Sequence, residues 1–377
     1  MNIHLSQIKN SIVLVRTNYD LPDLNHLVRI DDSLPTIRQL LDQNNKVVIC
    51  THWGRPVDND PTKSTNQLDE ILESKLRENV LAINQYDSFS NAQGEIKDTN
   101  AKVILLENTR YNKGEKSKDE SVRKELAAQY ASLASYFVDE AFAVSHRQEA
   151  TNYDIKNLLP WTFGLSHQAE LNNLNQLKDN PKKPFIAIMG GAKLETKLAL
   201  IKNLLPKVDQ IILGGMLSYT FLAAIEELQK ESNCPKEIQE FQVAPYYFSL
   251  VEKSFVPVAK DLLLKNWNKI VLPVDFVYGE LEAGKTVALD IGLESVLKFQ
   301  QITNNARTIF WNGPMGFYEK QPYHMGTLKL GEHLASLHNC HIVIGGGDVG
   351  SALPEQVLSQ FSWVSMGGGA TLEYLSK

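Results

Sequence analysis

The sequence predicts an α/β protein of two domains, each built on a parallel β-sheet. Three observations lead to this prediction. Short apolar runs rich in β-branched residues recur along the chain, and each is followed by a glycine-rich or polar turn. Helix-like segments lie between these runs, as in proteins whose strands alternate with helices. The chain has 377 residues, which is more than a single hydrophobic core usually supports.

Seven of the apolar runs are continuous rather than alternating, which is typical of strands buried on both faces of a parallel sheet. The segment after the first run predicts a helix over residues 31–44, with Ser33 as its N-cap, Pro35 in its first turn and its leucines on one face. The expected strands are residues 11–15, 46–50, 102–106, 185–189, 210–213, 308–311 and 341–344.

A break in this pattern at residues 165–184 predicts the connection between the two domains. The segment starts as a leucine-striped helix and ends at Asp-Asn-Pro, where proline disfavours helix in the residue before it. We therefore expect an N-terminal domain at residues 1–164, an interdomain helix and linker at 165–184, and a C-terminal domain at 185–377.

The composition excludes several classes of protein. Hydrophobic residues make up 43% of the chain and charged residues 22%, as in ordinary soluble proteins. The net charge of -6 argues against nucleic acid as a general partner. No apolar stretch is long enough to span a membrane and the start lacks a basic leader, so we expect a cytoplasmic protein without a membrane partner. The three cysteines are far apart, which argues against a structural metal.

Cationic side chains follow the strands of the first half. Because the carboxyl ends of parallel strands meet at one edge of a sheet, these side chains are expected to converge there. Guanidinium groups bind carboxylates and phosphates with charge-assisted hydrogen bonds, so the pattern predicts a pocket for a small anion. A single arginine after a strand is usually a solvated surface charge, but repetition at equivalent strand ends favours a site. The cations are Arg29, His52, Arg55, Arg110, His146 and Arg147.

Glycine-rich turns follow the strands of the second half. Glycine lets backbone N–H groups come close to a phosphate, so these turns predict a nucleotide site and, with the anion pocket, phosphoryl transfer between the halves. Two plainer interpretations stay open: the glycines can be tight connections only, and Lys193 and Lys197 can be a solvated helix face. The turns are residues 190–193, 214–216, 312–316, 345–348 and 367–371.

The stretch GGGDVG at residues 345–350 offers a different function. It fits the G-x-G-x-x-G fingerprint of dinucleotide-binding proteins and follows an expected strand. That fingerprint needs an acidic residue about 20 positions further on to bind the ribose, and none stands there. A dehydrogenase is therefore the weaker hypothesis.

Ten motifs together give the chain a resemblance to the phosphoglycerate kinases over nearly its whole length. In order, they are VLVRTNYDLP (13–22), THWGRP (51–56), LLENTRY (105–111), DEAFAVSHR (139–147), GGAKLETK (190–197), LPVDFV (272–277), LDIGLES (289–295), FWNGPMGFYE (310–319), GGGDVGSAL (345–353) and SMGGGATLE (365–373).

This resemblance implies a fold, a reaction and its ligands. The fold would be two Rossmann-like three-layer α/β/α domains joined by a helix and a hinge that closes them around the substrates. The reaction would be the glycolytic, reversible transfer of a phosphoryl group between 1,3-bisphosphoglycerate and ADP, giving 3-phosphoglycerate and ATP. The N-terminal domain would bind the phosphoglycerate and the C-terminal domain ADP or ATP with Mg2+. The enzyme would be a monomer.

The motifs also imply a role for individual residues. Asp348 would hold the magnesium nucleotide, Glu319 would bind the ribose, and Arg29 and Lys197 would stabilise charge during transfer. No general base is needed, because the acceptor oxygens are already ionised. The phosphoglycerate-binding residues would be Asn18, Tyr19, Asp20, Arg29, His52, Arg55, Arg110 and Arg147. The nucleotide-binding residues would be Lys193, Lys197, Gly214, Gly215, Gly292, Asn312, Pro314, Glu319, Gly346, Gly347, Asp348 and Val349.

The chain departs from the family pattern at several positions. Asn18 and Asp20 have exchanged places, and Met216, Val349 and Met366 replace a glycine or a hydroxyl residue. The tail after the last motif is short, so coupling between the domains is expected to be weaker. An alternative therefore stays open: a weakly active or inactive relative that binds nucleotide or phosphoglycerate as a sensor or scaffold. The retention of the cations and of Asp348 favours an active kinase.

Overall fold

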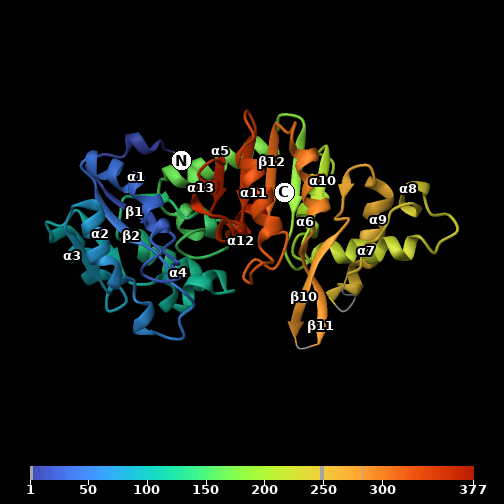
Figure 1. The fold of residues 1–377 in the computed structure, drawn as a ribbon. Coiled ribbons are helices and arrows are strands. Elements are labelled where there is room, and N and C mark those ends of the chain that lie inside the picture. Colours follow the sequence, from blue (N-terminus) through green and yellow to red (C-terminus); the bar gives the residue numbers. More distant parts are fainter. Residues whose placement is uncertain (1–2, 247–249, 283) are drawn as a thin grey trace. The chain divides into compact units, whose positions relative to one another are not determined.

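The computed structural model describes residues 3–246, 250–282 and 284–377. The chain divides into two compact units, Met1–Asn172 and Asn173–Lys377, which Figure 1 shows in blue to green and in green to red. The division falls inside one continuous helix, α5 (Leu165–Lys178), whose Leu174 and Leu177 side chains are buried. None of the helices in the described part of the chain is long and apolar enough to cross a membrane.

The N-terminal unit contains a sheet of six parallel strands in the order β3-β4-β2-β1-β5-β6. Strands β1, β2 and β4 lie within one residue of their predicted positions. Strands β3, β5 and β6 were not among the predicted strands; β3 and β6 are short and mostly only partly buried. The strands are β1 (Ile12–Arg16), β2 (Lys46–Cys50), β3 (Val80–Ile83), β4 (Val103–Leu106), β5 (Tyr136–Asp139) and β6 (Trp161–Phe163).

Helices cover both faces of this sheet and enclose two separate cores. Val13 and Val15 of β1 pack with α1 and α2, whereas Leu14 between them packs with α3 and α4 on the opposite face. This alternation is why the β1 run is apolar throughout. The helices are α1 (Val28–Asp42), α2 (Asp69–Leu76), α3 (Phe89–Asp98) and α4 (Glu120–Ala131). The 3-10 helices are η1 (Leu5–Gln7), η2 (Pro61–Lys63), η3 (Thr65–Leu68), η4 (Thr109–Tyr111), η5 (Lys113–Lys116), η6 (Phe142–Val144) and η7 (Asp154–Asn157).

The predicted start of the first long helix is wrong. Helix α1 begins at Val28, so Pro35 lies inside the helix and Ser33 is not its N-cap. The Ser33 hydroxyl is buried, donates to the carbonyl of Ile30 at 2.8 Å, and shares a hydrogen bond of 2.7 Å with the Tyr19 hydroxyl. Serine therefore serves here to satisfy a buried tyrosine rather than to start a helix.

The C-terminal unit contains a second sheet of six parallel strands, in the order β14-β13-β12-β7-β8-β9. The four strands predicted in this half are present within one residue. The antiparallel hairpin of β10 and β11, which extends away from the sheet in Figure 1, was not predicted. The strands are β7 (Phe185–Met189), β8 (Gln210–Leu213), β9 (Ile270–Val271), β10 (Phe276–Glu282), β11 (Lys285–Ile291), β12 (Thr308–Asn312), β13 (His341–Gly345) and β14 (Trp363–Ser365).

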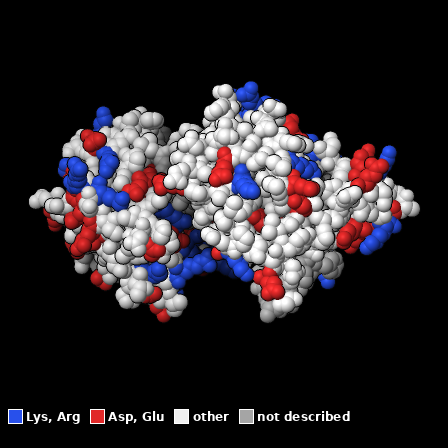
Figure 2. Space-filling view, in the orientation of Figure 1, with Lys and Arg blue, Asp and Glu red and all other residues white. Residues whose placement is uncertain are grey.

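The helices of the C-terminal unit follow its strands, so both units have the predicted α/β architecture with parallel sheets. Acidic and basic side chains are interspersed over the visible face of the molecule (Figure 2). The helices are α6 (Leu198–Leu204), α7 (Leu217–Leu228), α8 (Lys236–Gln239), η9 (Lys253–Phe255), α9 (Val256–Asn266), α10 (Leu293–Thr303), α11 (Met325–Ala335), α12 (Gly347–Ala352), α13 (Glu355–Leu358) and α14 (Gly369–Leu375).

Candidate active site

Cationic side chains gather beyond the carboxyl ends of the strands in the N-terminal unit. Burial lowers the pKa of Lys116, and the neighbouring charges of Arg110, Arg147 and Arg55 lower it further. Burial likewise lowers the pKa of Arg110, with Arg16 and Arg147 adding to the effect. We call this group the basic cluster: Arg16, Arg29, His52, Arg55, Arg110, Lys116 and Arg147.

Arg16 forms the buried centre of the basic cluster and was not predicted as a site residue. Its side chain is fully buried at the end of β1, and its Nε donates to Thr151 Oγ1 at 2.9 Å. Its Nη2 lies 3.7 Å from Glu115 Oε1 and 3.6 Å from Glu149 Oε2. Burial opposes the charge of Arg16, but these carboxylates raise its pKa above the ordinary value. The guanidinium therefore stays charged without contact with water.

His52 is neutral and its tautomer follows from its neighbours. Burial, together with Arg16, Arg110 and Arg147, lowers the pKa of His52 well below its usual value. Its Nδ1 lies 3.2 Å from Arg16 Nη2, and because a guanidinium can only donate, Nδ1 is the acceptor. The proton therefore sits on Nε2, which lies 3.8 Å from Asp20 Oδ2.

Asp20 links the turns that follow β1 and β2. Arg29 Nη1 donates to the Asp20 carbonyl at 2.5 Å, and the Gly54 amide donates to Asp20 Oδ1 at 2.8 Å. Arg110 Nη1 then donates to the Gly54 carbonyl at 2.5 Å, so Gly54 is held from both sides. Asn18 Oδ1 is buried, and no hydrogen-bond partner for it lies among the described residues.

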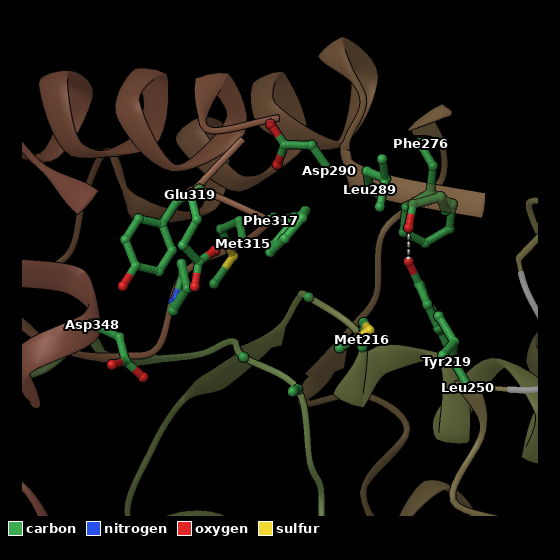
Figure 3. Close-up of a pocket in the computed structure, with 17 residues that line it drawn as sticks. Met216, Tyr219, Leu250, Phe276, Leu289, Asp290, Met315, Phe317, Glu319 and Asp348 are labelled. Atoms are coloured by element: carbon green, nitrogen blue, oxygen red, sulfur yellow. Dashed lines mark hydrogen bonds between the residues drawn. The ribbon is translucent and has the colours of Figure 1, made fainter. Parts of the chain in front are cut away.

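The C-terminal unit contains a cavity of about 370 Å³ beyond the ends of its strands. Asp348 and Glu319 lie on one side of it, and Tyr219, Leu250 and Phe276 on the other (Figure 3). One side of the cavity is therefore acidic and the other is apolar. We call the whole cavity the aromatic cavity. It is lined by Gly191, Ala192, Gly215, Met216, Tyr219, Leu250, Phe276, Ala288, Leu289, Asp290, Pro314, Met315, Gly316, Phe317, Tyr318, Glu319 and Asp348.

Glycines allow the turns beside the cavity to pack tightly against one another. The Gly190 amide donates to the Asn312 carbonyl at 2.8 Å, and the Gly191 amide donates to the Pro314 carbonyl at 2.8 Å. The Gly215 amide donates to the Met315 carbonyl at 3.1 Å. The amides of these three glycines therefore donate to backbone carbonyls of the neighbouring turn. A Cβ atom on Gly190 would lie 2.1 Å from the Pro314 carbonyl oxygen, so glycine is required for this packing.

Lys197 lies where these turns meet. Its side chain is 9% exposed, and its Nζ lies 2.5 Å from Asn312 Oδ1 and 3.2 Å from the Asn312 carbonyl oxygen. Burial lowers its pKa to about 8, against the attraction of Asp348. Helix α6 begins only at Leu198, so Lys197 and the exposed Lys193 belong to the preceding turn rather than to a helix face.

Comparison with known proteins identifies the family. The family model described as phosphoglycerate kinase matches residues 3–377. A phosphoglycerate kinase of Salinispora arenicola is 36% identical over 392 residues, covering 96% of this chain and 92% of that protein. The chain belongs to the phosphoglycerate kinase family. One from Thermus thermophilus is 36% identical over 392 residues, covering 98% of this chain and 95% of that protein.

Solved structures agree with this membership. The structure of phosphoglycerate kinase from Coxiella burnetii matches all of this chain and 96% of its own, with a TM-score of 0.81 and 30% identity. The predictions of a glycolytic phosphotransferase and of two parallel α/β domains are thereby confirmed.

Three residues that the phosphoglycerate kinase motifs assigned to binding have no side chain that reaches either site. Tyr19 is fully buried in the core, where its hydroxyl contacts Ser33. Val349 is fully buried in α12, and Gly292 is the N-cap of α10 beside the Asp275 carboxylate. Neighbouring motif residues in a turn or helix point to different sides, so any contact of these residues with a ligand would be made by the backbone, and their binding roles stay a prediction.

The remaining motif residues of the phosphoglycerate kinase pattern lie around the cavity. Gly215, Pro314, Glu319 and Asp348 line it. Asn312 holds Lys197 and also donates to the Gly345 carbonyl. A Cβ on Gly214 would meet Met315 Sδ and one on Gly346 would meet Asn312 Nδ2, whereas one on Gly347 would meet no atom within 4 Å. Met216, in place of the pattern's third glycine, lines the cavity.

Asp290 is a buried carboxylate in the cavity wall that the phosphoglycerate kinase motifs did not single out. It is 3% exposed, and it accepts hydrogen bonds from the Gly326 amide at 2.6 Å and the Ile291 amide at 2.9 Å. Burial raises its pKa to about 7, although these hydrogen bonds lower it. This carboxyl therefore takes up its proton at a much higher pH than an exposed aspartate does.

Asp290→Asn is expected to flatten the pH dependence of stability between pH 5 and 8. Because the folded-state pKa lies above the unfolded one, the contribution of this carboxyl is complete below about pH 4 and is lost as the pH rises through about 7. A rise from 3.8 to about 7 corresponds to at most about 4 kcal/mol. Thermal unfolding of wild type and of Asp290→Asn at pH 5 and at pH 8 checks this. The other titrating groups contribute equally to both proteins, so their effect cancels in the comparison. Equal losses of Tm in both proteins would contradict it.

Proposed function

We propose that this chain catalyses the reversible transfer of a phosphoryl group between 1,3-bisphosphoglycerate and ADP, giving 3-phosphoglycerate and ATP. The observation that carries the proposal is the match of residues 3–377 to the phosphoglycerate kinase family. The basic cluster and the aromatic cavity supply what each substrate requires. ADP and ATP are the co-substrates of this family.

The basic cluster binds the phosphoglycerate. Arg110 and Arg147 provide guanidinium groups for its phosphate, and neutral His52 can donate from Nε2. Arg55 and Lys116 add positive charge at the rim. Asn18, Asp20 and Arg29 lie at the other end, where the hydroxyl and carboxylate of the substrate would bind. Tyr19 contributes its backbone only.

The aromatic cavity binds the nucleotide. Tyr219, Phe276 and Leu250 form the apolar side that suits an adenine ring, and Glu319 accepts from the ribose hydroxyls. Lys197 then faces the phosphate end together with Asp348, to whose charge it is coupled. Lys193 is exposed, so its side chain can move and keep contact with the nucleotide phosphates.

Asp348 would hold Mg2+ with the nucleotide. Its carboxylate is exposed in the first turn of α12 and lines the cavity. The described residues contain no group of three or more His, Cys, Asp and Glu that could hold a metal ion alone. One carboxylate still fits, because Mg2+ usually takes one or two carboxylates, with phosphate oxygens and water completing its shell. When bound, Mg2+ would neutralise charge on the nucleotide phosphates.

Transfer needs positioning and charge stabilisation rather than acid–base chemistry. The attacking oxygen of either acceptor is already ionised, so the enzyme aligns the groups and stabilises the transferring phosphoryl charge. Arg29 and Lys197 serve this role. Water would intercept the phosphoryl group, so hinge closure through residues 165–184 accompanies catalysis. We also propose that the chain acts as a monomer in the cytoplasm, which size-exclusion chromatography with light scattering and cell fractionation can test.

The test is turnover of ATP and 3-phosphoglycerate by the purified chain, coupled to NADH oxidation. Arg147→Ala is expected to raise the KM for 3-phosphoglycerate by about 10- to 100-fold with little change for ATP, because it removes a charge-assisted contact. Asp348→Ala is expected to raise the KM for ATP with little change in the KM for 3-phosphoglycerate. Equal damage to both KM values in each variant would contradict the division of roles.

Two further outcomes decide against the proposal. No turnover by wild type, with calorimetric binding of ADP or 3-phosphoglycerate intact, would favour the binding protein without activity. Tight binding of NAD without binding of ADP would favour the dehydrogenase hypothesis.

A further inference from the structure

Glu149 places a negative charge inside the basic cluster. Its side chain is 2% exposed, and neither carboxylate oxygen has a hydrogen-bond partner among the described residues. Its nearest cations are Arg16, whose Nη2 lies 3.6 Å from Oε2, and Arg147, whose Nη1 lies 3.7 Å from Oε1. A buried carboxylate without hydrogen bonds is costly, so these charges must hold it in place.

The second buried carboxylate of the cluster differs from Glu149. Glu115 accepts from Thr151 Oγ1 at 2.6 Å and from the Thr151 amide at 3.2 Å, so its oxygens have local donors. Glu115 is therefore part of the structural framework around Arg16. Glu149 instead lies between the buried Arg16 and Arg147, whose side chain is 38% exposed.

The backbone fixes the position of Glu149. Its carbonyl oxygen accepts from the Tyr153 amide at 2.8 Å, and the next residue, Ala150, donates its amide to the Glu115 carbonyl at 3.0 Å. Asn152 Nδ2 donates to the Val144 carbonyl at 2.5 Å, which ties the loop to η6. The carboxylate cannot easily leave the cluster when an anion arrives.

We propose that Glu149 is an internal counterion of the basic cluster that weakens the binding of phosphoglycerate. This inference rests on the proposed function, because it concerns the affinity of that same site. In the free protein Glu149 offsets the repulsion between Arg16 and Arg147. In the complex, the phosphate must share Arg147 with a fixed carboxylate, and like charges brought together in a dry site lower affinity. Glu149 thus favours release of phosphoglycerate.

Glu149→Gln tests this, because glutamine keeps the shape and one acceptor oxygen but removes the charge. Calorimetric titration with 3-phosphoglycerate is expected to show binding tighter by about tenfold or more. The KM for 3-phosphoglycerate is expected to fall while the KM for ATP stays unchanged. The matched control is Glu70→Gln, which removes the same charge from an exposed position on α2 and is expected to change neither value.

The outcomes separate this inference from the proposed function. If wild type binds no 3-phosphoglycerate, the proposed function fails. If wild type binds it and Glu149→Gln binds it equally well or more weakly, Glu149 is only a structural anchor for Arg147 and the inference is wrong. Should the glutamine variant not fold, Glu149→Met serves instead, because it removes the same charge with a side chain of similar volume. Removing one partner of a buried ion pair costs stability, but Arg16 keeps Glu115 as a second carboxylate at 3.7 Å. Glu149→Met carries the same expectation of tighter binding.

Discussion

Lys197→Met is expected to lower kcat by about 100- to 1000-fold, the usual effect of losing a group that stabilises transition-state charge. Lys197 is 9% exposed and its ammonium lies against Asn312, so water cannot replace it in stabilising negative charge. Methionine keeps the apolar stem in place. Because the pKa of Lys197 in the free protein is about 8, wild-type kcat/KM is also expected to fall as the pH rises through this value and the ammonium loses its proton. Coupled assays between pH 6 and 9 check both expectations.

The stability of this variant distinguishes a chemical role from a structural one. Burial lowers the folded-state pKa of Lys197, so its charge costs folding energy at neutral pH, and methionine should leave Tm unchanged or raise it. Lys202→Met, an exposed lysine of α6, is the matched control and is expected to keep full activity. Retained turnover in Lys197→Met would overturn the assignment.

Gly190→Ala is expected to destabilise the C-terminal unit by about 3 kcal/mol or more, as overpacking against backbone does when neither side can move. The new Cβ would lie 2.1 Å from the Pro314 carbonyl oxygen and 2.6 Å from that of Gly313. Separating these turns would also move Asn312, which holds Lys197. Denaturant unfolding measures the loss of stability, and ADP titration the loss of nucleotide affinity.

Gly347→Ala is the control for this prediction. No heavy atom lies within 4 Å of a Cβ built on Gly347, and its φ is not in the left-handed region, so stability should change by less than about 1 kcal/mol. If both variants unfold at the same denaturant concentration, close packing of the turns is not the reason for glycine at 190.

The sequence predicted the strands well where burial on both faces made the run apolar throughout. β1, β2, β7 and β12 are of this kind. β6 is only half-buried, and its sequence WTF is not a continuous apolar run, so the sequence did not indicate a strand there. The predicted start of helix α1 was wrong for a different reason. Ser33 has the composition of an N-cap, but a tertiary contact with Tyr19 decides its role.

The site was predicted to the extent that residue type reveals a role. Arginines after strands are visible in the sequence, and the structure gathers them beside one sheet. The sequence could not reveal that Arg16 and Glu149 are buried together, because their pairing depends on the fold of a loop 133 residues further along the chain, counted from 16 to 149. The lining of the aromatic cavity comes from several separate segments, and no local pattern joins Tyr219 to Phe276.

The hydrogen bond from Lys197 to Asn312 has a consequence for the speed of the reaction. Asn312 also donates to the Gly345 carbonyl, so the ammonium is fixed by a framework that reaches from β12 to β13 before any ligand arrives. Such preorganisation means that the charge needs little rearrangement when the phosphoryl group moves in either direction. The energy of arranging it is supplied once, during folding, and not again in every turnover.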